Sequence, residues 1–149
     1  MDLKIGDLAE RTGTNAPTIR YYEEIGLLPK ASRRAGGQRS YGDGDVRLLT
    51  FIRRCRDFGF PIAQVRALLT LMRDRGRSCM DARDIARDHL DQVRAKLVEL
   101  EALERSIAGF VQSCDSACAG GPGPDCVILG DLAAPAPRPE PRRARRARA

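Results

Sequence analysis

The sequence has no tryptophan and one histidine, and aromatic residues make up only 5% of its 149 positions. It contains no apolar run approaching the roughly 20 residues of a membrane-spanning helix. Its first residues, Met1–Ile5, carry no signal-peptide hydrophobic region, so we expect a cytoplasmic protein with no membrane partner. A Ser/His/Asp set, a phosphate-binding loop and a helix-borne His-Glu pair are all missing from the sequence, which predicts that the protein is not an enzyme.

Cysteine occurs five times, an odd number. In a reducing compartment such thiols are metal ligands or buried side chains more often than disulfides. The charge is uneven, with a net +5 in residues 1–75, −4 in residues 76–137 and +5 in residues 138–149. A basic head and an acidic middle fit a head that binds nucleic acid and an arm that pairs with a second copy.

The longest periodic stretch predicts one helix from Ser78 to about Cys114. Its apolar residues recur at alternating steps of four and three, the heptad pattern of a coiled coil: Ala86, Leu90, Val93, Leu97, Leu100, Ile107 and Val111. Leu103 covers the one missed position, Glu104. A seam this narrow cannot form a core by itself, so we interpret residues 78–114 as a dimerisation helix.

Residues 1–75 carry the signals of a DNA-binding head. A short helix is expected over residues 5–13, and Thr14-Asn15 can cap a second helix that has Pro17 in its first turn and stops at Gly26. Two helices joined by a tight turn are typical of a helix-turn-helix. Two further amphipathic helices are expected over residues 43–58 and 61–75, with Cys55 on the apolar face as a small core residue.

Between these helices, residues 30–40 are rich in Arg, Gly and Ser, and Gly36-Gly37 predicts the tip of a two-stranded wing. The arginines around this tip, Arg33, Arg34 and Arg39, fit phosphate contact and a solvated basic loop equally well.

The C-terminal part is expected to be irregular. Residues 120–124, Gly-Gly-Pro-Gly-Pro, predict a non-helical loop, and residues 127–129 fit one helical turn or a strand stub. The Ala, Pro and Arg residues of 133–149 predict a disordered tail. That tail is either solvated or a sequence-blind electrostatic anchor on DNA, and we favour the anchor.

Four stretches together resemble the MerR family of bacterial transcription regulators, in its heavy-metal-responsive branch. They are IGDLAERTGTNAPTIRYYEEIGLLP, GGQRSYGDGDVRLLTFIRRCRDFGFPIAQVRALL, SCMDARDIARDHLDQVRAKLVELEALE and the closing DCVILGDL. The resemblance covers about residues 1–132. It implies a mainly α fold, with a winged helix-turn-helix head (1–75), a long antiparallel coiled-coil dimerisation helix (78–114) and a C-terminal metal-binding loop (114–132).

The resemblance also implies a function. A homodimer would bind double-stranded promoter DNA, and metal binding would distort that DNA so that RNA polymerase starts transcription. The implied DNA contacts are Thr18, Arg20, Tyr21, Tyr22, Arg33, Arg34, Arg39 and Tyr41. Arg20 is the first choice for a base-edge or phosphate contact. We expect one of the two adjacent tyrosines to lie in the core and Tyr21 to be the contact. Arg53-Arg54 either contacts phosphate or forms a solvated face, and we favour the solvated face.

Cys79, Cys114 and Cys126 match the family's three metal-ligand positions, and Cys118 is an additional thiol. The copper-type sensors of the family have Ser in place of Cys79, which implies a divalent zinc, cadmium, lead or mercury ion as effector here. If Cys118 is a ligand, a four-coordinate site favours zinc or cadmium; without it, three thiolates favour mercury or lead. Asp115, Asp125 and His89 are weaker candidate ligands, His89 being more typical of a half-buried helix residue.

Cys79 and Cys114 of one chain would lie roughly 50 Å apart along a helix, because each residue rises about 1.5 Å. They therefore share an ion only if two chains pair antiparallel, which places Cys79 of one chain beside Cys114, Cys118 and Cys126 of the other. Three alternatives remain: Cu(I) sensing through Cys118 and Cys126, redox sensing that includes an iron–sulfur cluster, and a metal-storage or metal-transfer protein.

Overall fold

A computed structural model of the chain describes residues 2–136, and the predicted Arg-rich tail lies outside them from residue 137 onward. Six α-helices, a short 3-10 helix and one two-stranded sheet make up the secondary structure of this range, which confirms the mainly α class. One compact unit extends to Gln92 and a second begins at Val93. No helix within residues 2–136 is long and apolar enough to cross a membrane.

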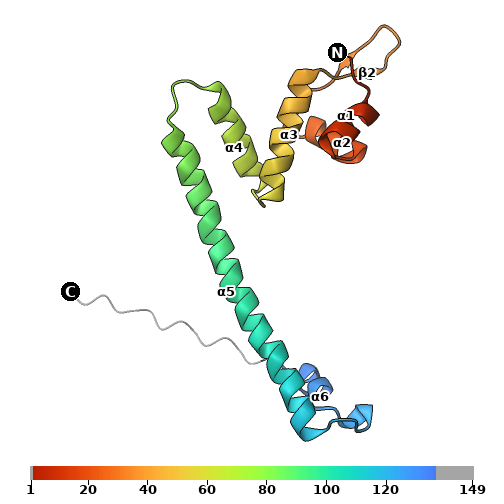
Figure 1. Ribbon diagram of the computed structural model, residues 1–149, viewed down its shortest axis with the longest axis vertical. Helices are drawn as coiled ribbons and strands as arrows, with labels where there is room; N and C mark the ends of the chain where they lie inside the picture. Colours follow the sequence, from red (N-terminus) through yellow and green to blue (C-terminus); the bar gives the residue numbers. More distant parts are fainter. Residues whose placement is uncertain (1, 137–149) are drawn as a thin grey trace, which may run out of the picture. The chain divides into compact units, whose positions relative to one another are not determined.

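The first unit contains the predicted helical head (Figure 1). Its elements, in chain order, are α1 Ile5–Thr12, α2 Ala16–Glu24, β1 Ser32–Arg33, β2 Arg39–Ser40, α3 Asp43–Asp57 and α4 Ile62–Arg73. The core is built from side chains of all four helices and of the segments around the sheet. Its fully buried members are Tyr41, Leu8, Ile19, Leu28, Leu49, Ile52 and Val65, and Cys55 is buried with them, as predicted.

Local signals explain the helix-turn-helix. The Asn15 side chain accepts a hydrogen bond from the Thr18 N–H at 2.9 Å and so caps α2, with Pro17 in the first turn. Beyond α2, Gly26 adopts a left-handed φ of 70°, a conformation that costs glycine little. The Leu27 N–H then donates to the Tyr22 carbonyl at 2.9 Å, which closes the helix end.

The wing is an antiparallel hairpin in which Ser32 pairs with Ser40 and Arg33 pairs with Arg39. Its turn is closed by the Gly37 N–H, which donates to the Arg34 carbonyl at 2.9 Å. Figure 1 shows the hairpin projecting beyond the helices of the head. The predicted wing, with its tip at Gly36-Gly37, is therefore confirmed.

Two arginines, one on α3 and one on α4, donate hydrogen bonds to backbone carbonyls at the C-terminal ends of α1 and α2. The Arg53 guanidinium on α3 donates to the carbonyls of Thr12 and Gly13, and Arg66 on α4 donates to the Ile25 carbonyl at 2.7 Å. Carbonyls at a helix C-terminus lack partners within the helix, and a cation there also complements the helix dipole. The expectation that Arg53 only forms a solvated face is wrong, because its side chain is a structural tie between α1 and α3.

Helix α5, Cys79–Ala117, packs against the head through His89. The His89 Nε2 atom lies 2.7 Å from the Phe58 carbonyl oxygen, and the His89 ring centroid lies 4.4 Å from that of Phe60. Both partners belong to the connection between α3 and α4. His89 is therefore a half-buried packing residue, as its place beside the apolar seam indicated.

The second unit contains the rest of α5, the 3-10 helix η1 Gly123–Asp125 and helix α6 Val127–Ala133. Three expectations need correction. Helix α5 continues to Ala117 and not to about Cys114, because no glycine or proline follows until Gly120. Part of the predicted non-helical loop is 3-10 helix, and Ala133, which was expected to start the tail, is the last residue of α6. The helical alternative for residues 127–129 is confirmed, because these residues begin α6.

Candidate functional site

Basic side chains from α2 and the wing share one face of the head. A hollow of about 460 Å³ lies between these elements, and it is lined by Arg20, Lys30, Arg33 and Arg39 together with Glu23, Glu24 and Ala31. Arg20 is exposed on α2, and Arg33 and Arg39 face each other across the paired strands. Guanidinium groups brought together from two elements form a surface that suits phosphate and base-edge contacts.

The remaining predicted contacts divide into exposed and buried side chains. Tyr21 is 48% exposed, whereas Tyr22 is 7% exposed and packs in the core. The expectation that only one of the two tyrosines is available to a partner is therefore confirmed, and Tyr22 is corrected to a core residue. Thr18 is half-buried, and Arg34 is exposed in an ion pair with Asp2 at 2.6 Å.

Tyr41 was also expected to contact DNA, but its side chain is only 1% exposed. Its hydroxyl donates to Oε1 of Glu23 at 3.0 Å, and the same oxygen accepts the Ala31 N–H at 3.2 Å. Nη1 of Arg39 lies 3.8 Å from the other carboxylate oxygen. Tyr41 is therefore an anchor beneath the wing, and direct contact of its side chain with DNA does not fit this burial.

Glu23 is the residue that sequence reasoning missed. Its carboxylate is buried and joins α2 to both ends of the wing segment. A signal was present, because Ile19 and Glu23 are one helical turn apart and so share the face of α2 that enters the core. An acidic residue on such a face requires hydrogen-bonding partners.

The Tyr41 anchor predicts a pH dependence of stability. Burial, followed by the hydrogen bond to Glu23, raises the pKa of Tyr41 to about 12. The unfolded chain loses this proton near pH 10, so Tyr41 contributes stability below that pH and loses it as the pH rises toward about 12. We expect the free energy of unfolding from urea titrations to fall over this range. Tyr41→Phe should be less stable at neutral pH and show a smaller fall, and an equally steep fall would contradict the assignment.

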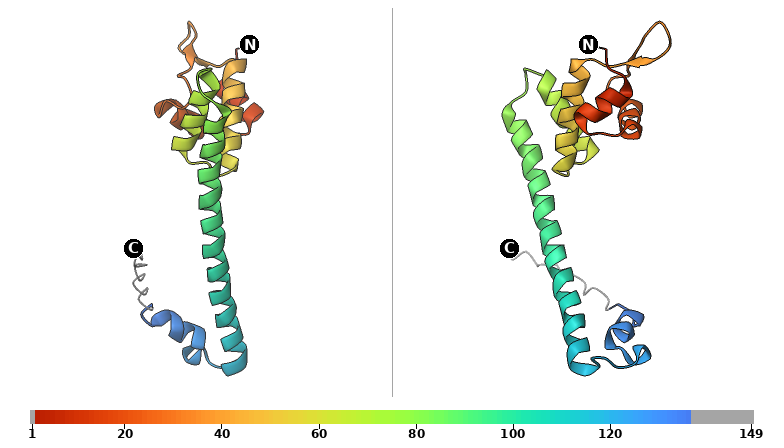
Figure 2. Two further views of the ribbon diagram at one scale, coloured as in Figure 1. Left: turned by 90° about the vertical axis from the view of Figure 1, so that its left-hand side faces the viewer. Right: turned by 45° about the vertical axis from the view of Figure 1, so that its right-hand side comes forward.

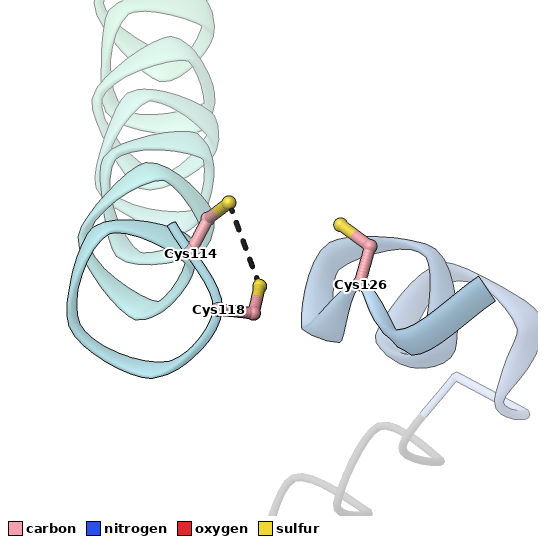
Figure 3. A group of neighbouring side chains, drawn as sticks. All are labelled: Cys114, Cys118 and Cys126. Carbon is pink, nitrogen blue, oxygen red and sulfur yellow. Dashed lines mark hydrogen bonds between the residues drawn. The ribbon is translucent and has the colours of Figure 1, made fainter. Parts of the chain in front are cut away.

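Three cysteines gather at the end of α5. The Sγ atoms of Cys114, Cys118 and Cys126 all lie within 4.8 Å of one another, with 3.7 Å between those of Cys114 and Cys118 (Figure 3). Cys114 is on the last turns of α5, and Cys118 follows the helix by one residue. Cys126 immediately precedes α6 and serves as its N-cap.

Backbone turns bring Cys126 back to the other two cysteines. Gly120 adopts a left-handed φ of 78°, and the Gly121 N–H donates to the Cys118 carbonyl at 2.8 Å. The Cys126 N–H then donates to the Gly123 carbonyl at 3.0 Å across η1. Figure 2 shows the chain reversing after α5, so that α6 begins close to the last turns of that helix.

The thiols of the cluster differ electrostatically. Interaction with the Cys118 thiol, then desolvation and the charges of its two neighbours, raises the pKa of Cys114 to about 11. The backbone N–H groups of Leu129 and Ile128 in the first turn of α6 lower the pKa of Cys126. The lowered pKa favours the thiolate form of Cys126, and a cation that binds Cys114 has to displace the Cys114 proton.

The donor set fits a thiophilic metal ion. In a tetrahedral site with metal–sulfur bonds of about 2.3 Å, the sulfurs stand about 3.8 Å apart, close to the observed 3.7 Å. Metal ions in proteins are commonly held by His, Cys, Asp or Glu. Within residues 2–136, the three sulfurs are the only group of at least three such ligand atoms that lie within 4.8 Å of one another. Asp115, Asp125 and His89 are outside the cluster, and Cys79 is exposed at the other end of α5.

Comparisons with known proteins agree with this architecture. Residues 3–72 match the model of the MerR HTH family regulatory proteins, and residues 46–110 match the MerR DNA-binding model. The chain is 38% identical over 131 residues to the HTH-type transcriptional regulator HmrR of Sinorhizobium medicae strain WSM419, covering 88% of this chain and 86% of that protein.

Two solved structures also share the fold. The transcription regulator PbrR691 of Ralstonia metallidurans CH34, in complex with lead(II), is 35% identical with a TM-score of 0.74, covering 88% of this chain and 99% of that one. The dual-function regulator MerR of Bacillus megaterium MB1, in complex with mercury(II), is 27% identical with a TM-score of 0.65, covering 87% and 98%.

Proposed function

This chain belongs to the MerR family of transcription regulators, and we propose that it is a heavy-metal-responsive member which activates a promoter when a divalent ion binds its cysteine cluster. The observation that carries the proposal is the cluster of three Sγ atoms within 4.8 Å of one another, in a chain that also has a winged helix-turn-helix head. Relatives solved with lead(II) and mercury(II) support a soft or borderline divalent effector. Such a regulator acts on promoter DNA, which in a bacterium lies in the cytoplasm.

The protein acts as a homodimer in this proposal. Helix α5 has no buried residue, and its heptad seam is open to a partner along its length, at Leu90, Val93, Leu97, Leu100, Leu103, Ile107 and Val111. A second copy running antiparallel would cover this seam. It would also bring Cys79 of the partner subunit to the open side of the cluster, so that each ion is held by both chains.

Control of transcription would operate through DNA shape. Two heads held by one dimer fix the distance and angle between two half-sites on the promoter. Metal binding at the dimer interface would favour a dimer geometry that bends and untwists the DNA between them, so that RNA polymerase can engage both of its promoter elements.

The test is transcription in a purified system. An operator would first be selected from random DNA by the full-length protein, then placed in a promoter and transcribed by bacterial RNA polymerase with zinc, cadmium, lead, mercury or Cu(I). Metal-dependent activation by a divalent ion supports the proposal. Operator binding without any metal response would refute the sensor, and metal binding without a preferred DNA sequence would instead favour a storage or transfer protein.

Arg20→Ala should weaken operator binding, because Arg20 is the exposed guanidinium on α2, the helix that enters the major groove in this motif. Loss of a base-edge contact costs about 1–3 kcal/mol, so we expect a roughly 5- to 150-fold rise in Kd at fixed salt. Arg105→Ala is the matched control, because it removes an equal charge from an exposed position on α5. Gel-shift titrations in which both variants lose affinity equally would show that only net charge matters.

A further inference from the structure

We propose that Cys118 is a metal ligand, and that it joins Cys114, Cys126 and Cys79 of the partner subunit in a four-thiolate, tetrahedral site. Such a site favours zinc or cadmium over mercury or lead, which bind well to three thiolates. The assignment rests on the proposed function, which supplies the ion and the dimer, and concerns a thiol outside the family's three matched ligand positions.

The first argument is the spacing of Cys114 and Cys118. The two residues are one helical turn apart, and the Cys118 N–H donates to the Cys114 carbonyl at 3.1 Å, so the helical geometry extends through Cys118. Residues four apart lie on the same face of a helix. Their sulfurs are 3.7 Å apart, close to the roughly 3.8 Å edge of a tetrahedral thiolate site. Both ligands can therefore bind one ion with little rearrangement.

The second argument is the direction of the three side chains. Figure 3 shows the Cys114 and Cys118 sulfurs turned toward the space between α5 and α6, with the Cys126 sulfur opposite them. All three residues are half-buried, and Cys79 is exposed. The turn at Gly120 and Gly121 that returns the chain to Cys126 is hydrogen-bonded to the Cys118 carbonyl, so the backbone holds Cys118 at the cluster.

The third argument is the count of donors. Three thiolates from one chain leave one vertex of a tetrahedron, and the dimer would offer one cysteine, Cys79 of the partner subunit, to fill it. Four thiolates around a divalent ion form the closed tetrahedral set typical of structural zinc sites. Without Cys118 the same arrangement would provide three, which leaves a trigonal site.

The test uses the reduced, metal-free, full-length dimer titrated with Cd(II) and Co(II). Thiolate-to-cadmium charge-transfer absorbance reports the number of bound sulfurs, and the visible bands of Co(II) report tetrahedral geometry. Cys118→Ser should lose roughly one quarter of the charge-transfer intensity and the four-thiolate cobalt bands, with at least about tenfold weaker cadmium binding. Ser116→Ala, an exposed change in the same turn, should behave as the parent protein.

The outcomes separate the two levels of the proposal. Parent protein that binds neither ion tightly would overturn the proposed metal response, and this assignment with it. Tight binding that requires Cys114 but is unchanged in intensity and affinity by Cys118→Ser would overturn the assignment alone. A Cys118→Ser protein that binds cadmium more weakly, with a three-thiolate spectrum and without the tetrahedral cobalt bands, would support Cys118 as the fourth ligand.

Discussion

Cys114→Ser is expected to abolish the transcriptional response to metal while leaving operator binding intact. Cys114 is central to the cluster, because its sulfur lies 3.7 Å from that of Cys118 and within 4.8 Å of that of Cys126. A hydroxyl is a poor ligand for soft ions. Even changes to residues that only hydrogen-bond to the ligands lower metal affinity about 10- to 100-fold. We therefore expect at least about 100-fold weaker binding of cadmium or zinc.

Operator binding should survive in this variant, because residues 114–126 make no contribution to the basic face of α2 and the wing. Gel shifts and in vitro transcription on the same promoter measure the two properties separately. Undiminished induction by metal in Cys114→Ser would show that the ion binds elsewhere. Cys55→Ser serves as a control, since it removes a thiol of the head core without touching the cluster.

A mixed dimer shows whether one ion is held by two chains. A Cys79→Ser chain keeps its three clustered cysteines, and a Cys114→Ser chain keeps Cys79. If the chains pair antiparallel, the heterodimer contains one complete site and one site that lacks two ligands. It should bind one cadmium ion per dimer with the four-thiolate spectrum and affinity of the unmodified protein, whereas the Cys79→Ser homodimer keeps only three-thiolate sites and the Cys114→Ser homodimer binds more weakly. A heterodimer that shows no four-thiolate site would refute the cross-chain site.

Most of the head was predictable because its signals are local. Asn15 and Pro17 define the start of α2, and Gly26 follows its end, each acting within a few residues of the helix terminus. The wing could likewise be predicted, from two adjacent glycines between two segments that contain arginine. Burial of Tyr41 was not predictable in this way, because its partner Glu23 is 18 residues away and its environment depends on how the wing packs against α2.

The cysteine cluster could be predicted only in part from the sequence. The family resemblance named Cys114 and Cys126 as ligands and left Cys118 open, but the bounds of the helices around them could not be predicted. Helix α5 runs on to Ala117 because no breaker intervenes, and that extension puts Cys118 within one turn of Cys114. Three apolar residues at 127–129 fit a helix or a strand equally well, and the α-helix there gives Cys126 its N-cap position. Both features depend on the path of the loop in three dimensions.

Leu97→Glu should convert the dimer into monomers and thereby remove both operator binding and metal response. Leu97 is a seam residue, 53% exposed, and it lies midway between Cys79 and Cys114. In an antiparallel pair that joins those cysteines across chains, the two Leu97 side chains meet near the two-fold axis. Each buried leucine contributes about 1.5–3 kcal/mol, so losing two weakens the dimer by roughly 3–6 kcal/mol, or about 10²- to 10⁴-fold.

The adjacent residue provides the control. Val98 is apolar and 63% exposed but lies outside the heptad seam, so Val98→Glu adds the same charge without entering the interface. Sedimentation equilibrium should find Leu97→Glu monomeric at concentrations where Val98→Glu remains dimeric. Because the antiparallel arrangement places the axis beside Leu97, Leu97→Glu should also weaken the dimer more than the same change at Val111, near the end of the seam. Equal losses at the two positions would argue against that axis and, with it, against the pairing of Cys79 with the cluster.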